Sequence, residues 1–394
     1  MAHMTPMLFL ALTACAPSVI PLYEAARNEA LSAPGPAPKS WEPDATLFLS
    51  HTLIDEALAT LLAQNGAFQT EIGGKLLMTT PELEVTEVVL KAADCDRCVR
   101  VIASLDGAIG VRSPLIDTSV PVNTKLRFDA VFDVDRNGEE WLLIVQPQKV
   151  ISARFEVGGT EIANLTRGMT KWLEAAIGEL PPVEVAKLGS PDLPIRGLRV
   201  VPIGRNLRLD LLTETRTTKH IVASEEPPAD GWRLDLSTDA LVDLARVAAF
   251  NAEALPLSIV AEPTSLLVEG GTFTLGLRLW RIKGRGWWRT YEVTGDAAVR
   301  NKGVVLTPLE VVEVDKSQGA AWADPLLALG HGIILKTLEN AINTSVPAIH
   351  RQKGGNLKVV VQIAKLEGSG DVLSVEGQLD LAPKKGAKAG KGAK

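Results

Sequence analysis

Two cysteines separated by two residues form the part of this sequence closest to a chemical motif. Cys95 and Cys98 stand in the stretch DCDRC, between two strand-like runs. A CxxC pair can support redox chemistry or supply half of a tetrahedral zinc site. No second Cys or His pair follows at a ligand spacing, and the five histidines are scattered. The sequence therefore favours a disulfide that pins a hairpin, and we expect no metal and no cofactor.

Motifs for enzyme catalysis are absent. The sequence contains no GxSxG, P-loop, GxGxxG or HExxH pattern. Acid pairs such as Glu139-Glu140 and Glu225-Glu226 fall in polar loops, where carboxylates face solvent, whereas acid–base chemistry needs carboxyl groups with separated pKa values. We expect no catalytic residue and no enzyme activity. A hydrolase assembled from scattered residues is an alternative that motifs alone do not address.

A third cysteine ends an apolar run near the start of the chain. MAHM resembles a cloning scar, and TPMLFLALTAC then ends in Leu12-Thr13-Ala14-Cys15. This run resembles the bacterial lipobox, in which the cysteine is acylated and becomes the first residue of the mature protein. The resemblance implies a signal-peptide remnant with a lipobox over residues 1–15, lipidation of Cys15, and a periplasmic protein anchored to a membrane. The alternatives are an ordinary secretory segment or a buried strand that contains a cysteine.

The segment after Cys15 and the last residues differ from the body in composition. Residues 16–44 are rich in Pro and Ala and predict a tether with one or two helical turns, whose flexible reach is roughly 30 Å. Residues 383–394 hold five lysines and no acid, and predict a disordered basic tail. The net charge of −6 argues against nucleic acid as a partner.

An aromatic and basic hairpin, LWRIKGRGWWRTYEV, is the most conspicuous local feature. Trp suits the head-group depth of a membrane and Arg suits phosphate, so we predict membrane docking by Arg285, Trp287 and Trp288. The alternative is that Trp280 and one of Trp287 and Trp288 face the core.

Two long stretches of the chain show the same order of elements. Leu47-x-Leu49-Ser50 matches Leu234-x-Leu236-Ser237, and each match opens a strand that leads into a helix. Period-2 strands, a turn and a long amphipathic helix stopped by proline follow in both. We interpret residues 45–211 and 232–382 as an internal duplication joined by residues 212–231. The predicted fold is α+β, an elongated double barrel of two tandem repeats, each a curled antiparallel sheet wrapped around a long amphipathic helix.

This order of elements resembles the tubular lipid-binding superfamily, whose members include bactericidal/permeability-increasing protein. The resemblance implies a lipid-binding or lipid-transfer protein that holds phospholipid, sterol or a similar ligand between sheet and helix. The candidate lining residues of the cavities are Leu126, Phe128, Phe132, Met169, Trp172, Phe273, Leu275, Leu277, Ile334 and Leu338. The rival interpretation is a structural lipoprotein with solid cores that binds an envelope protein through its outer surface.

Overall fold

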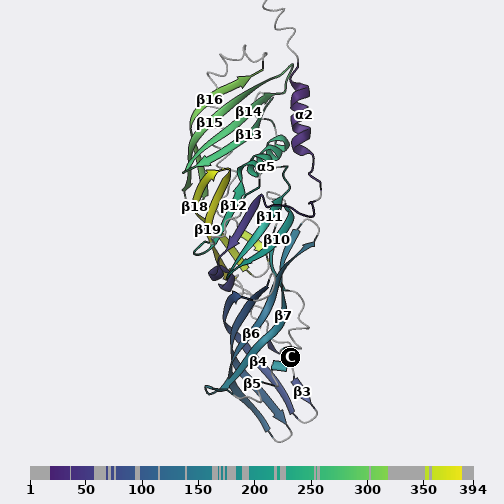
Figure 1. Ribbon diagram of the computed structural model, residues 1–394, viewed down its shortest axis with the longest axis vertical. Coiled ribbons are helices and arrows are strands. Elements are labelled where there is room, and N and C mark those ends of the chain that lie inside the picture. Colours follow the sequence, from purple (N-terminus) through teal and green to yellow (C-terminus); the bar gives the residue numbers. More distant parts are fainter. Residues whose placement is uncertain are drawn as a thin grey trace, which may run out of the picture.

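The computed structural model describes most of the chain between Ser18 and Pro383. The described residues are 18–35, 37–56, 68–69, 72–74, 77–93, 98–113, 116–137, 140–161, 167, 170–171, 174, 183–188, 195–216, 220–221, 228–252, 254, 258–300, 303–317, 351–354 and 357–383. They form two antiparallel sheets, stacked end to end in an elongated molecule (Figure 1).

The larger sheet has 11 strands among the described residues. Its order is β10-β11-β1-β12-β19-β18-β13-β14-β15-β16, with β17 paired to β18 outside this path. The strands are β1 (Ala45–Leu49), β10 (Ile195–Ile203), β11 (Asn206–Thr213), β12 (Trp232–Ser237), β13 (Ile259–Glu269), β14 (Thr272–Arg281), β15 (Trp287–Arg300), β16 (Gly303–Lys316), β17 (Arg351–Gly354), β18 (Leu357–Gly370) and β19 (Val372–Pro383).

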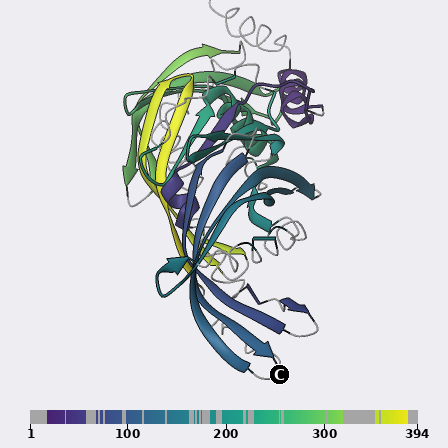
Figure 2. The same cartoon turned by 60° about the horizontal axis from the view of Figure 1, so that its bottom comes forward.

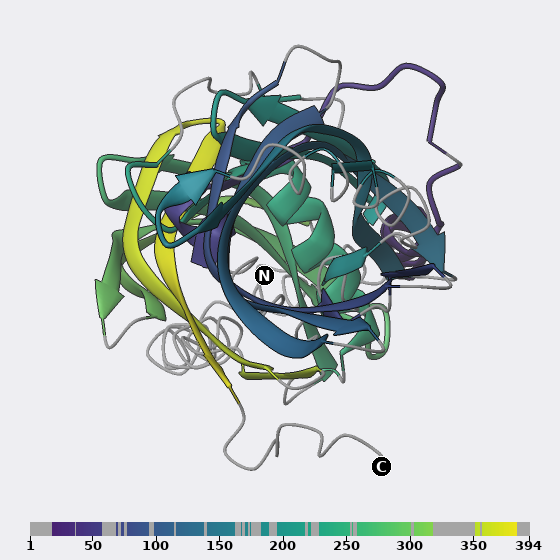
Figure 3. The same ribbon diagram turned by 90° about the horizontal axis from the view of Figure 1, so that it is seen from below.

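The smaller sheet has 8 strands in the described part of the chain, in the order β2-β4-β5-β6-β7-β8, with β3 on β4 and β9 on β7. Its strands are β2 (Phe68–Gln69), β3 (Ile72–Gly74), β4 (Leu77–Ala92), β5 (Cys98–Ser113), β6 (Ile116–Asn137), β7 (Glu140–Val157), β8 (Thr160–Glu161) and β9 (Val183–Leu188). Alternation explains the long strands: in β6, Val122 and Leu126 are buried while Lys125 and Arg127 are exposed. Seen from below, these strands follow a curve (Figure 3).

The first strand of each sequence half meets the other at the centre of the larger sheet. β1 pairs antiparallel with β12, and Leu47 lies opposite Leu234. Just outside this ladder the Ser50 N–H donates to the Gly231 carbonyl, and the Ser237 N–H donates to the Asp44 carbonyl. β11 lies on the other side of β1, and β19 lies on the other side of β12. The two halves of the sequence therefore share one sheet.

A shared apolar core joins the two sheets. Leu209 of β11 and Leu236 of β12 pack in one cluster with Val99 of β5, Phe132 of β6 and Leu143 of β7. Burial of this much aliphatic surface at ~25 cal/mol per Å² is the main stabilising term between the sheets. From this core the long strands of the smaller sheet run toward the lower end of the molecule (Figure 2).

Two helices pack beside the upper part of the larger sheet (Figure 1). α5 (Thr238–Asn251) follows β12 directly, with Asp239 in its first turn, and its Phe250 packs against Trp280. α2 (Ile20–Leu31) places the Tyr23 ring edge-on to Phe250 and Trp280, at centroid distances of 5.7 and 5.9 Å. The segment predicted to be a flexible tether is thus held against the body along this helix. None of the helices within the described ranges is long and apolar enough to span a membrane.

The predicted fold class is wrong. The structure is 66% strand and 16% helix, and it consists of two large antiparallel sheets, where the prediction had a sheet wrapped around a long helix in each half. The strand patterns identify which segments are extended, but pairing between distant strands decides the architecture. Because β1, β10 and β11 pair within the larger sheet, strands of residues 45–211 are divided between both sheets. The predicted long helix of the second half lies outside the described residues.

Candidate functional site

The lower part of the smaller sheet presents an apolar face built from three neighbouring strands. We name this the outer apolar face because it lies beyond the core between the sheets, although its side chains are buried; its buried members in the described residues are Ala103, Leu105, Ile109, Val122, Leu126, Val150, Ala153 and Phe155, with Phe128 and Val157 partly buried. Cross-strand pairing places Leu126 of β6 between Ala103 of β5 and Ala153 of β7. Because alanine side chains are short, we name the row Ala103-Leu126-Ala153 the low row; none of the described members of the face is titratable.

One polar atom interrupts the outer apolar face. Thr124 lies between Leu105 and Phe155 in the next row, and it is 4% exposed. The Thr124 hydroxyl makes no hydrogen bond to the described residues around it. Burial of an unpaired hydroxyl costs about 1–3 kcal/mol. A ligand oxygen or N–H that reached this position would remove that cost.

The larger sheet carries a second apolar face. Its buried members are Val268, Phe273, Leu277, Leu279, Trp287, Tyr291, Val293 and Ala297, which lie on β13, β14 and β15. Val311 of β16 packs against both groups of side chains that make up this face, so the face is continuous. Like those of the outer apolar face, all described members of the second apolar face lie on strands.

The structure distributes the predicted lining residues over three places. Leu126 belongs to the outer apolar face, Phe132 belongs to the core between the sheets, and Phe128 packs against both. Phe273, Leu275 and Leu277 belong to the second apolar face. The predicted lining residues Met169, Trp172, Ile334 and Leu338 lie outside the described residues.

The aromatic and basic hairpin is formed by β14 and β15. Trp280 and Trp287 are 2% and 3% exposed, so both side chains are buried, as in the alternative in which tryptophans face the core. They lie on opposite faces of the hairpin. Trp288 is half-buried, and the Arg278 guanidinium lies over its ring at 5.2 Å and over that of Trp280 at 5.5 Å. In the turn between these strands, Lys283 and Arg285 are exposed.

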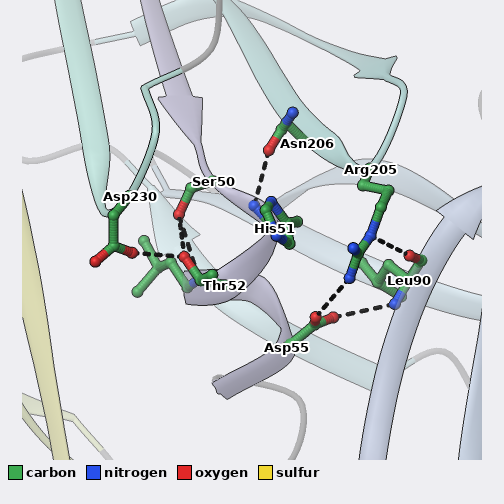
Figure 4. A network of polar contacts seen from close by, with 9 residues as sticks. Ser50, His51, Thr52, Asp55, Leu90, Arg205, Asn206 and Asp230 are labelled. Carbon is green, nitrogen blue, oxygen red and sulfur yellow. Dashed lines mark hydrogen bonds and ion pairs between the residues drawn. The ribbon is translucent and has the colours of Figure 1, made fainter.

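A polar joint connects the two sheets beside their shared core (Figure 4). Residues 51–56 are helical, and the Asp55 carboxylate there accepts hydrogen bonds from the Leu90 N–H of β4 at 3.1 Å and from Arg205 at 3.3 Å. Arg205, in the turn between β10 and β11, also donates to the Leu90 carbonyl at 2.8 Å. Burial raises the pKa of the Asp55 carboxyl, and its Leu90 and Arg205 contacts oppose that shift.

The same helical segment is fixed at its start. The Thr52 hydroxyl donates to the Asp230 carboxylate at 2.5 Å, and the His51 N–H donates to the Asn206 side chain at 2.9 Å. These contacts fix the position of the segment between the two sheets. Sequence reasoning missed the polar joint, because its residues are isolated polar positions with no motif.

A separate cleft of ≈ 490 Å³ lies between residues 38–42 and the β10–β11 hairpin. Its lining residues are Pro38, Ser40, Trp41, Glu42, Arg196, Leu212 and His220. The Arg199 guanidinium stacks on Trp41 at 5.0 Å and fixes one wall. No group of three or more His, Cys, Asp or Glu side chains within the described ranges is placed to hold a metal ion.

The remaining predicted sites fall at the margins of the described residues. Cys98, at the start of β5, is disulfide-bonded. Cys95, the predicted lipidation site Cys15, and residues 384–394 of the basic tail lie outside the described residues.

No protein-family model and no curated relative matches the sequence. Among solved structures, the chain is similar to a lipopolysaccharide binding protein at 10% identity and a TM-score of 0.36, covering 86% of this chain and 99% of that chain. It is also similar to the P47 protein of Clostridium botulinum E1 at 11% identity and a TM-score of 0.42, covering 86% of this chain and 100% of that chain. Both TM-scores are too low to assign a family, so the tubular lipid-binding resemblance stays a prediction.

Proposed function

We propose that this chain is an exported lipid-binding lipoprotein that holds acyl chains against its apolar strand faces and carries out no covalent chemistry. The main support for lipid binding is the outer apolar face. It combines aliphatic side chains, a low row at Ala103 and Ala153, and a single unpaired hydroxyl at Thr124. Aliphatic lining with a few polar groups is the usual composition of an apolar ligand site.

The energetics of acyl-chain binding fit such a face. Each buried methylene contributes ≈ 0.8 kcal/mol, so about ten methylenes contribute roughly 8 kcal/mol before the cost of immobilising the ligand. Apolar contact is therefore the main attractive term in the proposed binding, and it involves no ion pair in the face. The phospholipid and sterol ligands implied by the tubular lipid-binding resemblance present surfaces of this kind.

The location is part of the same proposal. The run that ends in Leu12-Thr13-Ala14-Cys15 supports lipidation of Cys15 and attachment to a membrane in a bacterial periplasm. An envelope protein partner fits the rival proposal, a structural lipoprotein whose sheets are solidly packed.

The test is a pair of tryptophan substitutions on opposite faces of β5. Ala103→Trp fills the low row of the outer apolar face, whereas Ala108→Trp places the same side chain on the other face of the strand. We expect Ala103→Trp to lower the affinity for a phospholipid with a fluorescent acyl chain at least about tenfold, which corresponds to ~1.4 kcal/mol, and to unfold at the wild-type temperature. Ala108→Trp should bind as the wild type does.

A solid core gives a different pattern. There, Ala103→Trp would overpack the sheet and cost about 1–3 kcal/mol of stability, and no form of the protein would bind the probe. That result would favour the structural lipoprotein. Thermal unfolding followed by circular dichroism separates the two outcomes.

A further inference from the structure

We propose that the protein stands on its membrane with the turn between β14 and β15 toward the lipid. This inference rests on the lipidation of Cys15 and is independent of lipid binding by the apolar faces. It commits to one partner, an anionic lipid surface, in contact with the exposed Lys283 and Arg285 of that turn.

Hydrogen bonds from Ser18 and Val19, together with the buried Val19 side chain, hold the N-terminal segment against this turn; we name this contact the clamp. The Val19 N–H donates to the Arg285 carbonyl at 3.1 Å, and the Ser18 hydroxyl donates to the same oxygen at 3.3 Å. The Val19 side chain is 6% exposed. Gly286 lies so close that a Cβ at this position would be 2.7 Å from Val19 Cγ2. The chain is therefore tied to the turn before α2 begins.

The short distance along the chain turns this clamp into a constraint on orientation. Four Cα–Cα steps separate Cys15 from Val19, and they span at most roughly 14 Å. A lipid on Cys15 must then lie within that distance of Val19 and of the β14–β15 turn. The reach of roughly 30 Å expected for a free tether does not apply, because α2 is docked on α5 and β14 through Tyr23.

The charge of the turn suits this position. Lys283 and Arg285 are exposed, and Arg281 is half-buried beside them. Each basic residue close to an anionic membrane strengthens attachment by roughly fivefold. Exposed charges farther apart than the ≈ 8 Å Debye length at physiological salt are largely screened, so the attraction acts when the turn lies closer to the lipid than the ~14 Å limit.

This orientation also fixes which end of the molecule lies farthest from the membrane. Ser119 of β6 pairs with Gly110 of β5, which pairs with Thr80 of β4, and β3 pairs with β4 at the neighbouring Thr79. Figure 1 places β3 at the lower end and α2 at the upper end. The lower end of the outer apolar face therefore points away from the anchoring membrane.

The test is energy transfer to the membrane from two labelled positions. The lipidated full chain is reconstituted in phosphatidylglycerol and phosphatidylcholine vesicles whose head groups carry an acceptor dye. A donor is attached at Lys283→Cys or at Ser119→Cys, both exposed in the wild type. We expect efficient transfer from position 283 and transfer several-fold weaker from position 119. Equal or reversed efficiencies would overturn the proposal.

A second variant tests the clamp. Val19→Asp places a charge in the buried contact below the turn, which should release α2 while Cys15 still anchors the chain. We expect this variant to float with vesicles as the wild type does and to lose most of the difference between positions 283 and 119. An unchanged difference would show that the clamp does not set the orientation. If wild type and Cys15→Ser both fail to float, the anchor and this proposal fail together, whereas binding of the acyl-chain probe in solution still reports on the apolar faces.

Discussion

Thr124 is the residue whose chemistry departs most from its surroundings. Its hydroxyl is buried between Leu105 and Phe155 on an otherwise aliphatic face. A polar group in such a place destabilises the empty protein unless a ligand pairs with it. The Thr124 hydroxyl therefore lowers the stability of the ligand-free fold and would serve only a bound ligand, so a substitution here distinguishes folding from binding.

Replacement of Thr124 by valine tests this separation. Thr124→Val keeps the shape and removes the unpaired hydroxyl, so the free energy of unfolding of lipid-free protein should rise by about 1 kcal/mol. The control is Thr86→Val, because the Thr86 hydroxyl donates to the Ser104 carbonyl at 3.1 Å and its loss should not stabilise. Urea unfolding measures both. A loss of more than about 1 kcal/mol for Thr124→Val would show that the hydroxyl is paired.

Asp55 gives the polar joint a predictable response to pH. Burial is the largest cause that raises the pKa of its carboxyl above the ordinary 3.8, against the Leu90 hydrogen bond and the Arg205 charge. The folded protein then binds the proton more tightly than the unfolded chain. This contribution to stability is full below the unfolded pKa and is lost as the pH rises through the folded pKa.

Asp55→Asn should remove that dependence. Between pH 3.8 and the raised folded pKa, the wild type should lose stability relative to Asp55→Asn as the pH increases. Asp106→Asn, on an exposed side chain of β5, is the matched control. Denaturant unfolding at several pH values gives the difference. A wild type that gains stability relative to Asp55→Asn over this window would show that the Arg205 ion pair outweighs burial.

At the scale of elements, local patterns predict the segments well. The pattern WRLDLSTDALVDLARVAAF predicts a strand followed by a helix, and the structure has β12 and α5 there. Asn137-Gly138 predicts a hairpin, and β6 and β7 pair with Asn137 opposite Glu140. The sequence does not predict the pairing of β1 with β12, because several strands carry alternating leucines and their patterns are compatible with many different pairings. The choice among them depends on contacts far apart in the sequence.

Gly286 is the glycine on which the β14–β15 turn and α2 both depend. Its φ is +66°, and the Arg281 carbonyl oxygen together with Val19 Cγ2 leaves no room for a Cβ. Gly286→Ala should cost about 2–3 kcal/mol and expose α2 to protease. The control, Gly284→Ala, has a φ of +72° with nothing within 4 Å, so it should cost only about 1 kcal/mol and leave α2 protected. Equal protease sensitivity of the two variants would contradict the clamp.

At the scale of the whole molecule, the sequence identifies apolar positions but not the surface that each one joins. Leu126 and Phe132 stand six residues apart on β6 with the same pattern, yet Leu126 lies in the outer apolar face and Phe132 fills the core between the sheets. Their difference arises from where the larger sheet ends, which no local signal encodes. Trp287 shows the same limit, since an aromatic residue beside arginines fits a membrane or a core equally well.

The central claim is that the protein carries lipid, and native mass spectrometry of the mature protein purified from envelope membranes tests it most directly. The bound material is then released by denaturation, extracted into solvent and identified. The account predicts a discrete added mass that is lost on unfolding and is identified as a lipid with acyl chains. A clean protein mass that stays unchanged after incubation with envelope lipid extract would contradict it.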